Sequence, residues 1–482
     1  MKVVSITTFD IGGGAARAGF RQHEALRRAG VDHWILAGKK LSADPFTVEA
    51  PPMRNSYVRS RQASLVRQFA IDRNRTALSD TWFSFPLRDT GLAEIEQVRS
   101  ADIIDVQWSS AFVSLDGLEE LFALGKPVTF TLHDQWAYTG GCHYTAGCER
   151  YLTDCRGCPQ LAVDPIGVPA ITLQLRKSLG AARRGTVIGP SRWMHETARR
   201  APVFAGWRHE HLPMPLDTGV FVPRNRAEAQ RHLGLGPGPW RVLFVAERVA
   251  EKRKGFSDLL EAGAKLGLIA GRPVHFVAMG TAPDRPADFG VRIQYLGKLD
   301  DQKDVAAAYS AADVMLLPSH EDNLPNTMLE ALACGTPVIG YDIGGLPDAV
   351  RPGLTGKLVP VGDVGALAGA IREVLESGAS ESWRGSCRSL AEAEFSYSVH
   401  ARRCIALYED ILRNHKASAV GPAGTGYDRV LWDACLQLTV NRLELRDEFS
   451  NEDKKTIMAG RMEYARLADP SAGVLRPGSM WV

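Results

Sequence analysis

The sequence lacks a long hydrophobic run and has almost no net charge. Its 482 residues contain no stretch of about eighteen apolar residues, so we expect no helix to cross a membrane. Lys and Arg number 57 against 55 Asp and Glu, and the net charge of +2 gives no overall sign of a nucleic-acid partner. Cysteines number only 8, which excludes a small scaffold held together by disulfides. With 45% apolar and 23% charged residues, the chain is neither disordered nor collagen-like.

The chain also lacks a signal for export near its start. A strand is expected at residues 3–6, and no apolar run with a small-residue cleavage site precedes it. We therefore expect the protein to lie in the cytoplasm.

Short apolar runs rich in β-branched residues recur along most of the chain, and amphipathic stretches separate them. Such runs are typical of strands buried on both faces, and intervening helices make the sheets parallel. The pattern predicts an α/β protein with two doubly wound, Rossmann-like domains. The expected strands fall at residues 3–6, 34–37, 103–106, 128–131 and 187–189 in the first half, and at 242–245, 274–277, 314–317 and 338–340 in the second.

Two stretches with the composition of linkers divide the chain. Residues 221–240 are rich in glycine and proline, and residues 417–426 consist mostly of small side chains. The pieces that follow are an N-terminal Rossmann-like domain, a C-terminal Rossmann-like domain, a helix that packs back on the N-terminal domain, and a helical tail without recognisable chemistry. We place them at residues 1–222, 240–395, 396–416 and 427–482, respectively.

The most informative segment, residues 318–331, follows an expected strand and opens an expected helix. Open α/β sheets bind ligands at this end of their strands. Asn323 is placed to cap the helix, with Pro325 in its first turn. Free backbone N–H groups and the positive end of the helix dipole there suit a diphosphate, and Asp322 and Glu330 are placed to meet sugar hydroxyls. An isolated spacing of this kind also fits an ordinary helix start.

The segment continues through Gly335-Thr336-Pro337-Val338, and with it resembles the retaining nucleotide-sugar glycosyltransferases of family four, which have the GT-B fold. Their signature is two acids separated by seven residues. Here these acids are Asp322 and Glu330, with aspartate in place of the usual glutamate. The motifs at residues 136–144 and 322–327 further resemble those of a subgroup that builds bacterial exopolysaccharides, including colanic-acid-type transferases. The resemblance covers residues 1 to about 413.

The resemblance implies that the N-terminal domain binds the acceptor and that the C-terminal domain binds the nucleotide sugar. It implies that Asp322 orients the donor sugar, that Glu330 holds the ribose and that His133 lies beside the transferred sugar. Without the resemblance, a lone histidine such as His133 is more often structural. The other donor-binding residues that the family implies are Gly13, Gly14, Asn323, Leu324, Pro325, Asn326 and Thr327.

A basic stretch at residues 247–256 is the expected partner of the donor diphosphate. The resemblance assigns this role to Lys254 together with Arg248 or Arg253. Fixed cations stabilise the charge on a departing diphosphate, so neither a catalytic cofactor nor a divalent metal is expected. A solvated basic loop is the alternative.

The glycine-rich loop after the first expected strand has a second interpretation. Gly12-Gly13-Gly14 opens a helix, as in the dinucleotide-binding fingerprint. That fingerprint needs glycine at its sixth position, where this chain has Arg17, and an acid after the second strand, where none stands. We therefore expect no NAD site.

Half of the cysteines lie close together in the sequence. In a cytoplasmic protein such clustering favours a metal over disulfides, and four thiolates suit a structural zinc ion. The first spacing is wider than is usual for zinc, and His143 is a substitute ligand. Reduced thiols and disulfides are the alternatives. The candidate ligands are Cys142, Cys148, Cys155 and Cys158.

A basic amphipathic stretch at residues 54–75 is a candidate for contact with an anionic membrane or a lipid-diphosphate acceptor. A solvated face explains it equally well. Membrane contact would place the protein at the inner face of the plasma membrane. Its arginines are Arg54, Arg59, Arg61, Arg67, Arg73 and Arg75, interleaved with Tyr57, Leu65, Phe69 and Ile71.

Taken with the resemblance, the sequence predicts a retaining glycosyltransferase that moves a sugar from a UDP- or GDP-sugar to a saccharide or lipid-linked saccharide, in bacterial polysaccharide or glycoconjugate biosynthesis. A sugar-nucleotide epimerase shares the two-domain architecture. A non-catalytic sugar-binding or assembly subunit is the third alternative, suggested by Asp322, the cysteines and the tail.

Overall fold

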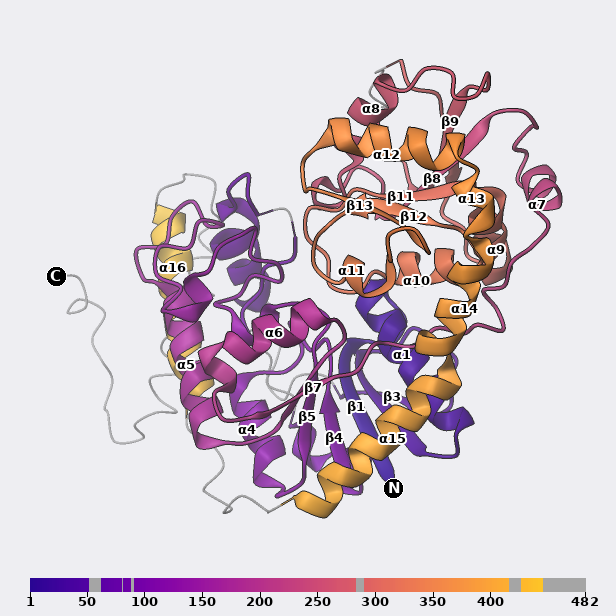
Figure 1. Cartoon of the computed structure of the whole chain (residues 1–482). Helices are drawn as coiled ribbons and strands as arrows, with labels where there is room; N and C mark the ends of the chain where they lie inside the picture. The colour runs from indigo at the N-terminus through magenta and orange to yellow at the C-terminus, as the bar shows by residue number, and fades with distance from the viewer. Residues whose placement is uncertain (52–61, 80, 88–90, 283–289, 416–425, 445–482) are drawn as a thin grey trace, which may run out of the picture.

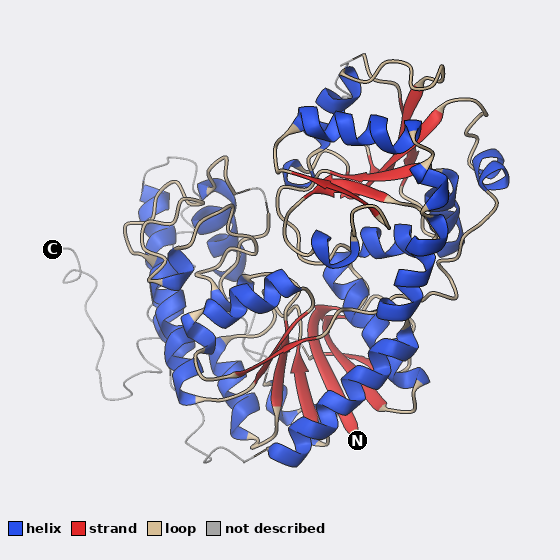
Figure 2. Cartoon of the chain, in the orientation of Figure 1, coloured by secondary structure: helices blue, strands red, loops and turns tan. Residues whose placement is uncertain are grey.

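Two parallel β-sheets, each flanked by helices, form the two halves of the computed structural model, which describes residues 1–51, 62–79, 81–87, 91–282, 290–415 and 426–444 (Figure 1). Figure 2 shows the sheets as two separate bodies with helices on both faces. No helix in these ranges combines the length and the hydropathy needed to span a bilayer.

The first sheet has seven strands in the order β3-β2-β1-β4-β5-β6-β7, and every neighbouring pair is parallel. The order reverses between β1 and β4. Its strands are β1 (Lys2–Phe9), β2 (Asp32–Lys39), β3 (Thr47–Glu49), β4 (Ile103–Val106), β5 (Val128–Thr131), β6 (Thr186–Gly189) and β7 (Arg208–His211).

The second sheet has six strands in the order β10-β9-β8-β11-β12-β13, again all parallel. Its order reverses between β8 and β11. The strands are β8 (Trp240–Arg248), β9 (Val274–Thr281), β10 (Ile293–Gly297), β11 (Val314–Leu317), β12 (Val338–Tyr341) and β13 (Gly356–Val359).

Helices lie between most consecutive strands, as crossovers between parallel strands require. Those of the first half are α1 (Gly13–Arg28), α3 (Glu96–Arg99), α4 (Leu115–Ala123), α5 (Val168–Ala182) and α6 (Arg192–Arg200). Those of the second are α7 (Arg226–His232), α8 (Phe256–Ala264), α9 (Gln302–Ala311), α10 (Asn326–Ala333), α11 (Leu346–Ala349), α12 (Val364–Glu376), α13 (Ala379–Ser382) and α14 (Arg384–Phe395). Two further helices, α15 (Tyr397–Asn414) and α16 (Tyr427–Glu444), follow.

Each sheet buries apolar side chains on both faces, because successive residues of a strand point to opposite sides. Val3 of β1 packs with α1 and α15 on one face, whereas Val4 packs with α4 and α6 on the other. In the second sheet Leu243 packs with α9 and α10, and Phe244 with α8 and α12. This two-sided burial explains why the strands appear in the sequence as continuous apolar runs.

The chain passes between the two halves twice, and the two connections lie side by side. It leaves the first half after β7 and returns between α14 and α15. At this point the Leu216 N–H donates to the Phe395 carbonyl at 2.7 Å, and Leu216 pairs with Ser396 in a parallel bridge. α15 then packs against α1 on the same face of the first sheet (Figure 1).

A separate apolar cluster lies beside the first sheet and contains α16. Leu431, Trp432 and Leu436 of this helix are buried against α5 and against the π-helical segment η1 (Val66–Ile71). Leu65, Phe69 and Ile71 therefore face protein, and they do not form the lipid-facing stripe that the sequence suggested. The arginines at 54, 59 and 61 and Tyr57 lie outside the described residues.

Buried neutral histidine makes the stability of this fold sensitive to acid. His400 of α15 donates from Nδ1 to the Pro213 carbonyl at 2.8 Å, and its buried Nε2 has no hydrogen-bond partner in the part of the chain that the structure describes. Burial lowers the pKa of His400 to about 4, against 6.5 in the unfolded chain. The unfolded state therefore binds a proton over this interval that the folded state does not, and stability falls as the pH falls from 6.5 to 4.

We expect His400→Asn, whose amide can replace the Nδ1 donor, to flatten the dependence of the unfolding free energy on pH. The difference between wild type and variant should change by up to about 3 kcal/mol across the interval, since each pKa unit corresponds to about 1.4 kcal/mol. Urea unfolding at pH 7, 6, 5 and 4 measures it. If the unfolding free energies of wild type and variant changed equally with pH, the lowered pKa of His400 would be contradicted.

Candidate functional site

The two points at which the strand order reverses face each other across the boundary between the sheets. Ligands bind at such points in open α/β sheets, beyond the carboxyl ends of the strands. The loops that follow β1 and β11 are in contact there, since Asn326 Nδ2 donates to the Gly14 carbonyl at 2.8 Å. The loop after β8 contacts the loop after β11, because the His320 N–H donates to the Arg253 carbonyl at 2.8 Å.

A carboxylate and two cations from these loops form the centre of the site. Asp322, which is 6% exposed, accepts from Lys254 Nζ at 2.5 Å and lies 3.5 Å from Arg253 Nη1. Burial alone would raise the pKa of Asp322, but the charges of Lys254 and Arg253 outweigh it and hold this pKa below its ordinary value. The carboxylate is therefore ionised, and both cations are held at one point.

Of the two candidate arginines, Arg253 is the one brought to Asp322. It also stacks on the ring of Tyr144, 4.5 Å from the ring centre, and donates to the Glu321 carbonyl at 2.7 Å. Arg248 lies at the exposed end of β8. The geometry favours Arg253 over Arg248 as the second cation.

Helix α10 begins two residues later than the predicted cap requires. Pro325 is the N-cap and Asn326 the first helical residue. The prediction that Asn323 caps this helix is wrong, because its side chain bonds to the first half instead. Its Nδ2 donates to the carbonyls of Leu132 and His133 at 3.2 and 3.1 Å, and its Oδ1 accepts from Ser191 at 2.7 Å.

The start of α10 still carries free donors. Among the described residues the buried Thr327 hydroxyl has no hydrogen-bond partner, and the first backbone N–H groups of a helix have no acceptor within the helix. Leu324 is partly buried against the core of the second half. On the facing side, Gly13 has a φ of +84°, a conformation that favours glycine, and opens α1.

Glu330 lies inside the site but with both oxygens engaged. Its Oε1 accepts from Arg21 Nη2 of α1 at 2.5 Å, and its Oε2 accepts from the Tyr309 hydroxyl at 2.7 Å. Only 7% of the residue is exposed. Each carboxylate oxygen has a second lone pair, so ribose hydroxyls can bind only by sharing these atoms with Arg21 and Tyr309.

His133, directly after β5, has a fixed tautomer. Gln107 donates from Nε2 to Asp105 at 2.9 Å and to Ser5 at 3.1 Å, so its Oε1 is the acceptor that faces His133 Nε2 at 3.1 Å. His133 must therefore carry its proton on Nε2 and present Nδ1 as an acceptor. Burial lowers the pKa of His133 to about 4, which keeps the ring neutral near pH 7.

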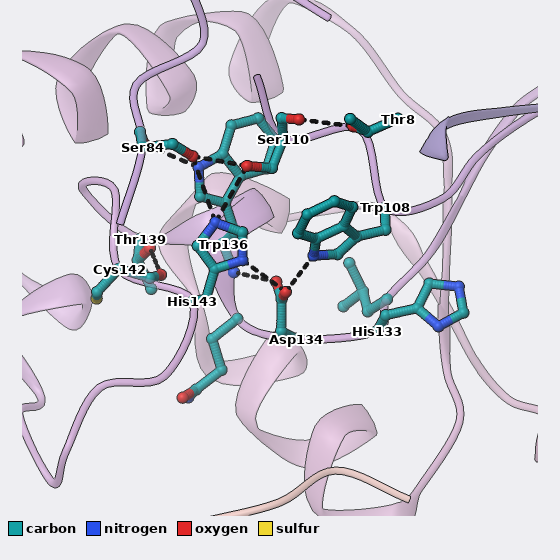
Figure 3. Close-up of polar contacts among 12 residues, drawn as sticks. Thr8, Ser84, Trp108, Ser110, His133, Asp134, Trp136, Thr139, Cys142 and His143 are labelled. Atoms are coloured by element: carbon teal, nitrogen blue, oxygen red, sulfur yellow. Dashed lines mark hydrogen bonds and ion pairs between the residues drawn. The ribbon is translucent and has the colours of Figure 1, made fainter. Parts of the chain in front are cut away.

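The residue after His133 anchors a second buried network, drawn in Figure 3. Asp134 accepts from His143 Nδ1 at 2.7 Å and from Trp108 Nε1 at 2.6 Å, while His143 Nε2 lies 3.1 Å from the Ser110 hydroxyl. His133 points away from this group. The network holds the strand end from which His133 projects.

Sequence reasoning missed Arg21, Gln107, Asp134 and Tyr309 as contributors to this region. They come from four different elements, and none belongs to a recognisable word. His143 was considered only as a metal ligand, whereas it pairs with Asp134.

The four clustered cysteines lie apart from the two cations, around a cavity of their own, and all four are free thiols. Within the described ranges, no group of three or more His, Cys, Asp and Glu side chains is arranged to hold a metal ion as it stands.

Comparison with known proteins agrees with this architecture. Residues 239–377 match the family described as glycosyl transferases group 1. The D-inositol 3-phosphate glycosyltransferase of Mycobacterium sp. (strain KMS) is 38% identical over 178 residues, which are 35% of this chain and 39% of that protein. That of Mycolicibacterium smegmatis is 34% identical over 219 residues, 43% of this chain and 49% of that protein. The chain thus matches less than half the length of these curated relatives.

Among solved structures, sucrose-phosphate synthase from Thermosynechococcus elongatus has a TM-score of 0.59 at 20% identity, covering 86% of this chain and 100% of that one. Anabaena Alr3699/HepE in complex with UDP has a TM-score of 0.56 at 16% identity, covering 85% and 100%. These likenesses confirm the predicted fold of two Rossmann-like domains. The chain has the GT-B fold, and within it residues 239–377 match the family described as glycosyl transferases group 1.

Proposed function

We propose that this chain is a retaining glycosyltransferase that moves a sugar from a nucleotide-sugar donor to a saccharide or lipid-linked saccharide acceptor. The observation that carries the proposal is the pairing of Lys254 and Arg253 on Asp322 beside the start of α10. Two cations and a helix N-terminus at a strand-order reversal suit a diphosphate.

In this proposal the donor diphosphate takes over both cations. The side chains of Lys254 and Arg253 pair with the phosphate oxygens instead of with Asp322. The backbone N–H groups of Asn326 and Thr327 and the Thr327 hydroxyl donate to the same oxygens. Asp322, relieved of its cations, accepts from hydroxyls of the donor sugar. Because fixed cations stabilise the departing diphosphate, the proposal requires no divalent ion.

The proposed stereochemistry is retention at the anomeric carbon. The acceptor hydroxyl attacks from the face that the diphosphate leaves, and a phosphate oxygen takes its proton. His133 contributes as a neutral ring. Its unprotonated Nδ1 can accept a hydrogen bond from a sugar hydroxyl but cannot donate one. Glu330, through the oxygens that it shares with Arg21 and Tyr309, holds the ribose.

The nature of the donor and acceptor is proposed from the relatives. Anabaena HepE has been crystallised with UDP, and with UDP-glucose, so UDP is the first nucleotide to test and GDP the second. Another protein of this fold is WaaG, a glycosyltransferase involved in lipopolysaccharide biosynthesis, with a TM-score of 0.53. We place this chain in bacterial polysaccharide or glycoconjugate biosynthesis, in the exopolysaccharide subgroup that residues 136–144 and 322–327 resemble.

The first expected result is binding of a nucleoside diphosphate in EDTA. UDP at about a hundred times its dissociation constant should stabilise the protein by about 2.7 kcal/mol, visible as a thermal shift. In Lys254→Met the loss of a charge-assisted bond of about 1.5–3 kcal/mol should weaken binding about 10- to 100-fold. Lys252→Met, an exposed lysine in the same turn, is the matched control and should bind as wild type does.

Equal shifts in wild type and Lys254→Met would argue against the diphosphate site. If no nucleoside diphosphate shifts the wild type, the alternative of a non-catalytic subunit gains support.

The second expected result concerns pH. Because burial lowers the pKa of His133 to about 4, this ring is protonated only as the pH falls towards 4, and kcat/KM should show no histidine titration between pH 5.5 and 7.5. A pH–rate profile of wild type and His133→Asn measures this. An acid limb near pH 6.5 that disappears in His133→Asn would show that the ring titrates normally.

The third expected result separates a transferase from the epimerase alternative. Supplied with donor alone, the protein should leave the nucleotide sugar intact apart from slow hydrolysis. Supplied with donor and a saccharide acceptor, it should form a glycoside with the anomeric configuration of the donor, as read from NMR coupling constants. Complete conversion of the donor alone into an epimer would refute the transferase.

A further inference from the structure

The cysteine-bearing segment is a long excursion with little regular structure. Residues 139–167 connect two elements of the first half and contain one single-turn 3-10 helix, η5 (Arg150–Leu152). Its backbone takes up left-handed conformations at several positions, including Cys155 with a φ of +53°. A loop of this length that is neither helix nor strand needs another source of order.

The four thiols of the segment come together in space. Cys142, Cys148, Cys155 and Cys158 all line one small cavity, together with Phe83, Tyr151 and other residues of an apolar wall. None of the four thiols is in a disulfide.

A buried cation stands beside the thiols without a carboxylate of its own. Arg176 of α5 is 4% exposed and donates to the Thr139 carbonyl at 3.0 Å, with its guanidinium 4.3 Å from the ring centre of Trp136. In the part of the chain that the structure describes, no acid forms an ion pair with it, and burial lowers the pKa of Arg176 to about 9. A buried charge is costly unless an opposite charge compensates it.

We propose that Cys142, Cys148, Cys155 and Cys158 bind a structural Zn²⁺ ion as a tetrahedral set of four thiolates. Four S–H groups give their protons to solvent, four S–Zn bonds form, and the resulting site of net charge −2 is partly neutralised by Arg176. Binding requires rotation of the thiols about χ1 towards a common centre, because they are not arranged for a metal as they stand.

The site would also stiffen the diphosphate region, because the same loop reaches the second half of the molecule. Thr145 and Ala146 donate their N–H groups to the Glu321 carboxylate at 3.2 and 3.0 Å. Tyr144 lies under Arg253. The metal would therefore fix the part of the loop that holds Arg253 and the residue before Asp322.

The test is metal content, and it is independent of any transferase activity. Full-length protein purified without added metal should contain one zinc per chain by mass spectrometry. A mercurial reagent should release this zinc as four thiols are blocked, followed with a zinc-binding dye. Cys155→Ser and Cys158→Ser should lose the zinc, whereas Cys404→Ala, a buried cysteine of α15, should retain it.

Several results would overturn the proposal. These are wild-type protein with less than a tenth of a zinc per chain, iron with the colour of a cluster in place of zinc, or a disulfide among the four cysteines after purification. The mercurial titration uses wild type, so the test stands even if the serine variants fail to fold. If zinc is present, its release by the mercurial reagent should also reduce the thermal shift with UDP at a fixed concentration; an unchanged shift would refute the coupling to Arg253.

Discussion

The loop between β11 and α10 determines how the two halves meet, because three consecutive polar residues bind three different partners. Glu321 accepts backbone N–H groups from the cysteine-bearing loop, Asp322 holds Lys254 and Arg253, and Asn323 bonds to the end of β5 and to Ser191. A shift of this loop by one residue would exchange these partners. The position of the cations, the carbonyl of His133 and the first turn of α10 thus depend on one short segment.

Buried polar networks on the first half give this segment a fixed surface to meet. Asp105 is fully buried and accepts from Thr129, Thr131 and Gln107, and Gln107 in turn selects the tautomer of His133. Burial raises the pKa of Asp105, and its hydrogen bonds offset part of that rise. Such groups are expensive to bury unless every partner is present, so the network also specifies a single arrangement of the strand ends.

The sequence predicted the sheets where strands are buried on both faces and failed where they are not. The nine expected runs all lie within observed strands. β7 reads Arg208-His209-Glu210-His211, a polar edge strand without the apolar run that identifies its neighbours. β3, β10 and β13 are only partly buried, and they also lack a continuous apolar run. Contiguous site residues around 254 and 322–330 could be picked out, because a motif is a local pattern. Partners such as Arg21 and Gln107 could not, since only the fold brings them near. The cap at Asn323 was wrong for the same reason: its Oδ1, the atom that would accept a local N–H, accepts from the distant Ser191 hydroxyl instead.

The paired connections behind the site have a mechanical consequence. Because Leu216 is hydrogen-bonded to Phe395 and paired with Ser396, the outgoing and returning chains form one two-stranded hinge rather than two independent tethers. Such a hinge permits rotation about its own axis and resists sliding and twisting. Rotation of one half relative to the other would therefore take place about this hinge, and facing residues of the two halves would return to the same positions on closure.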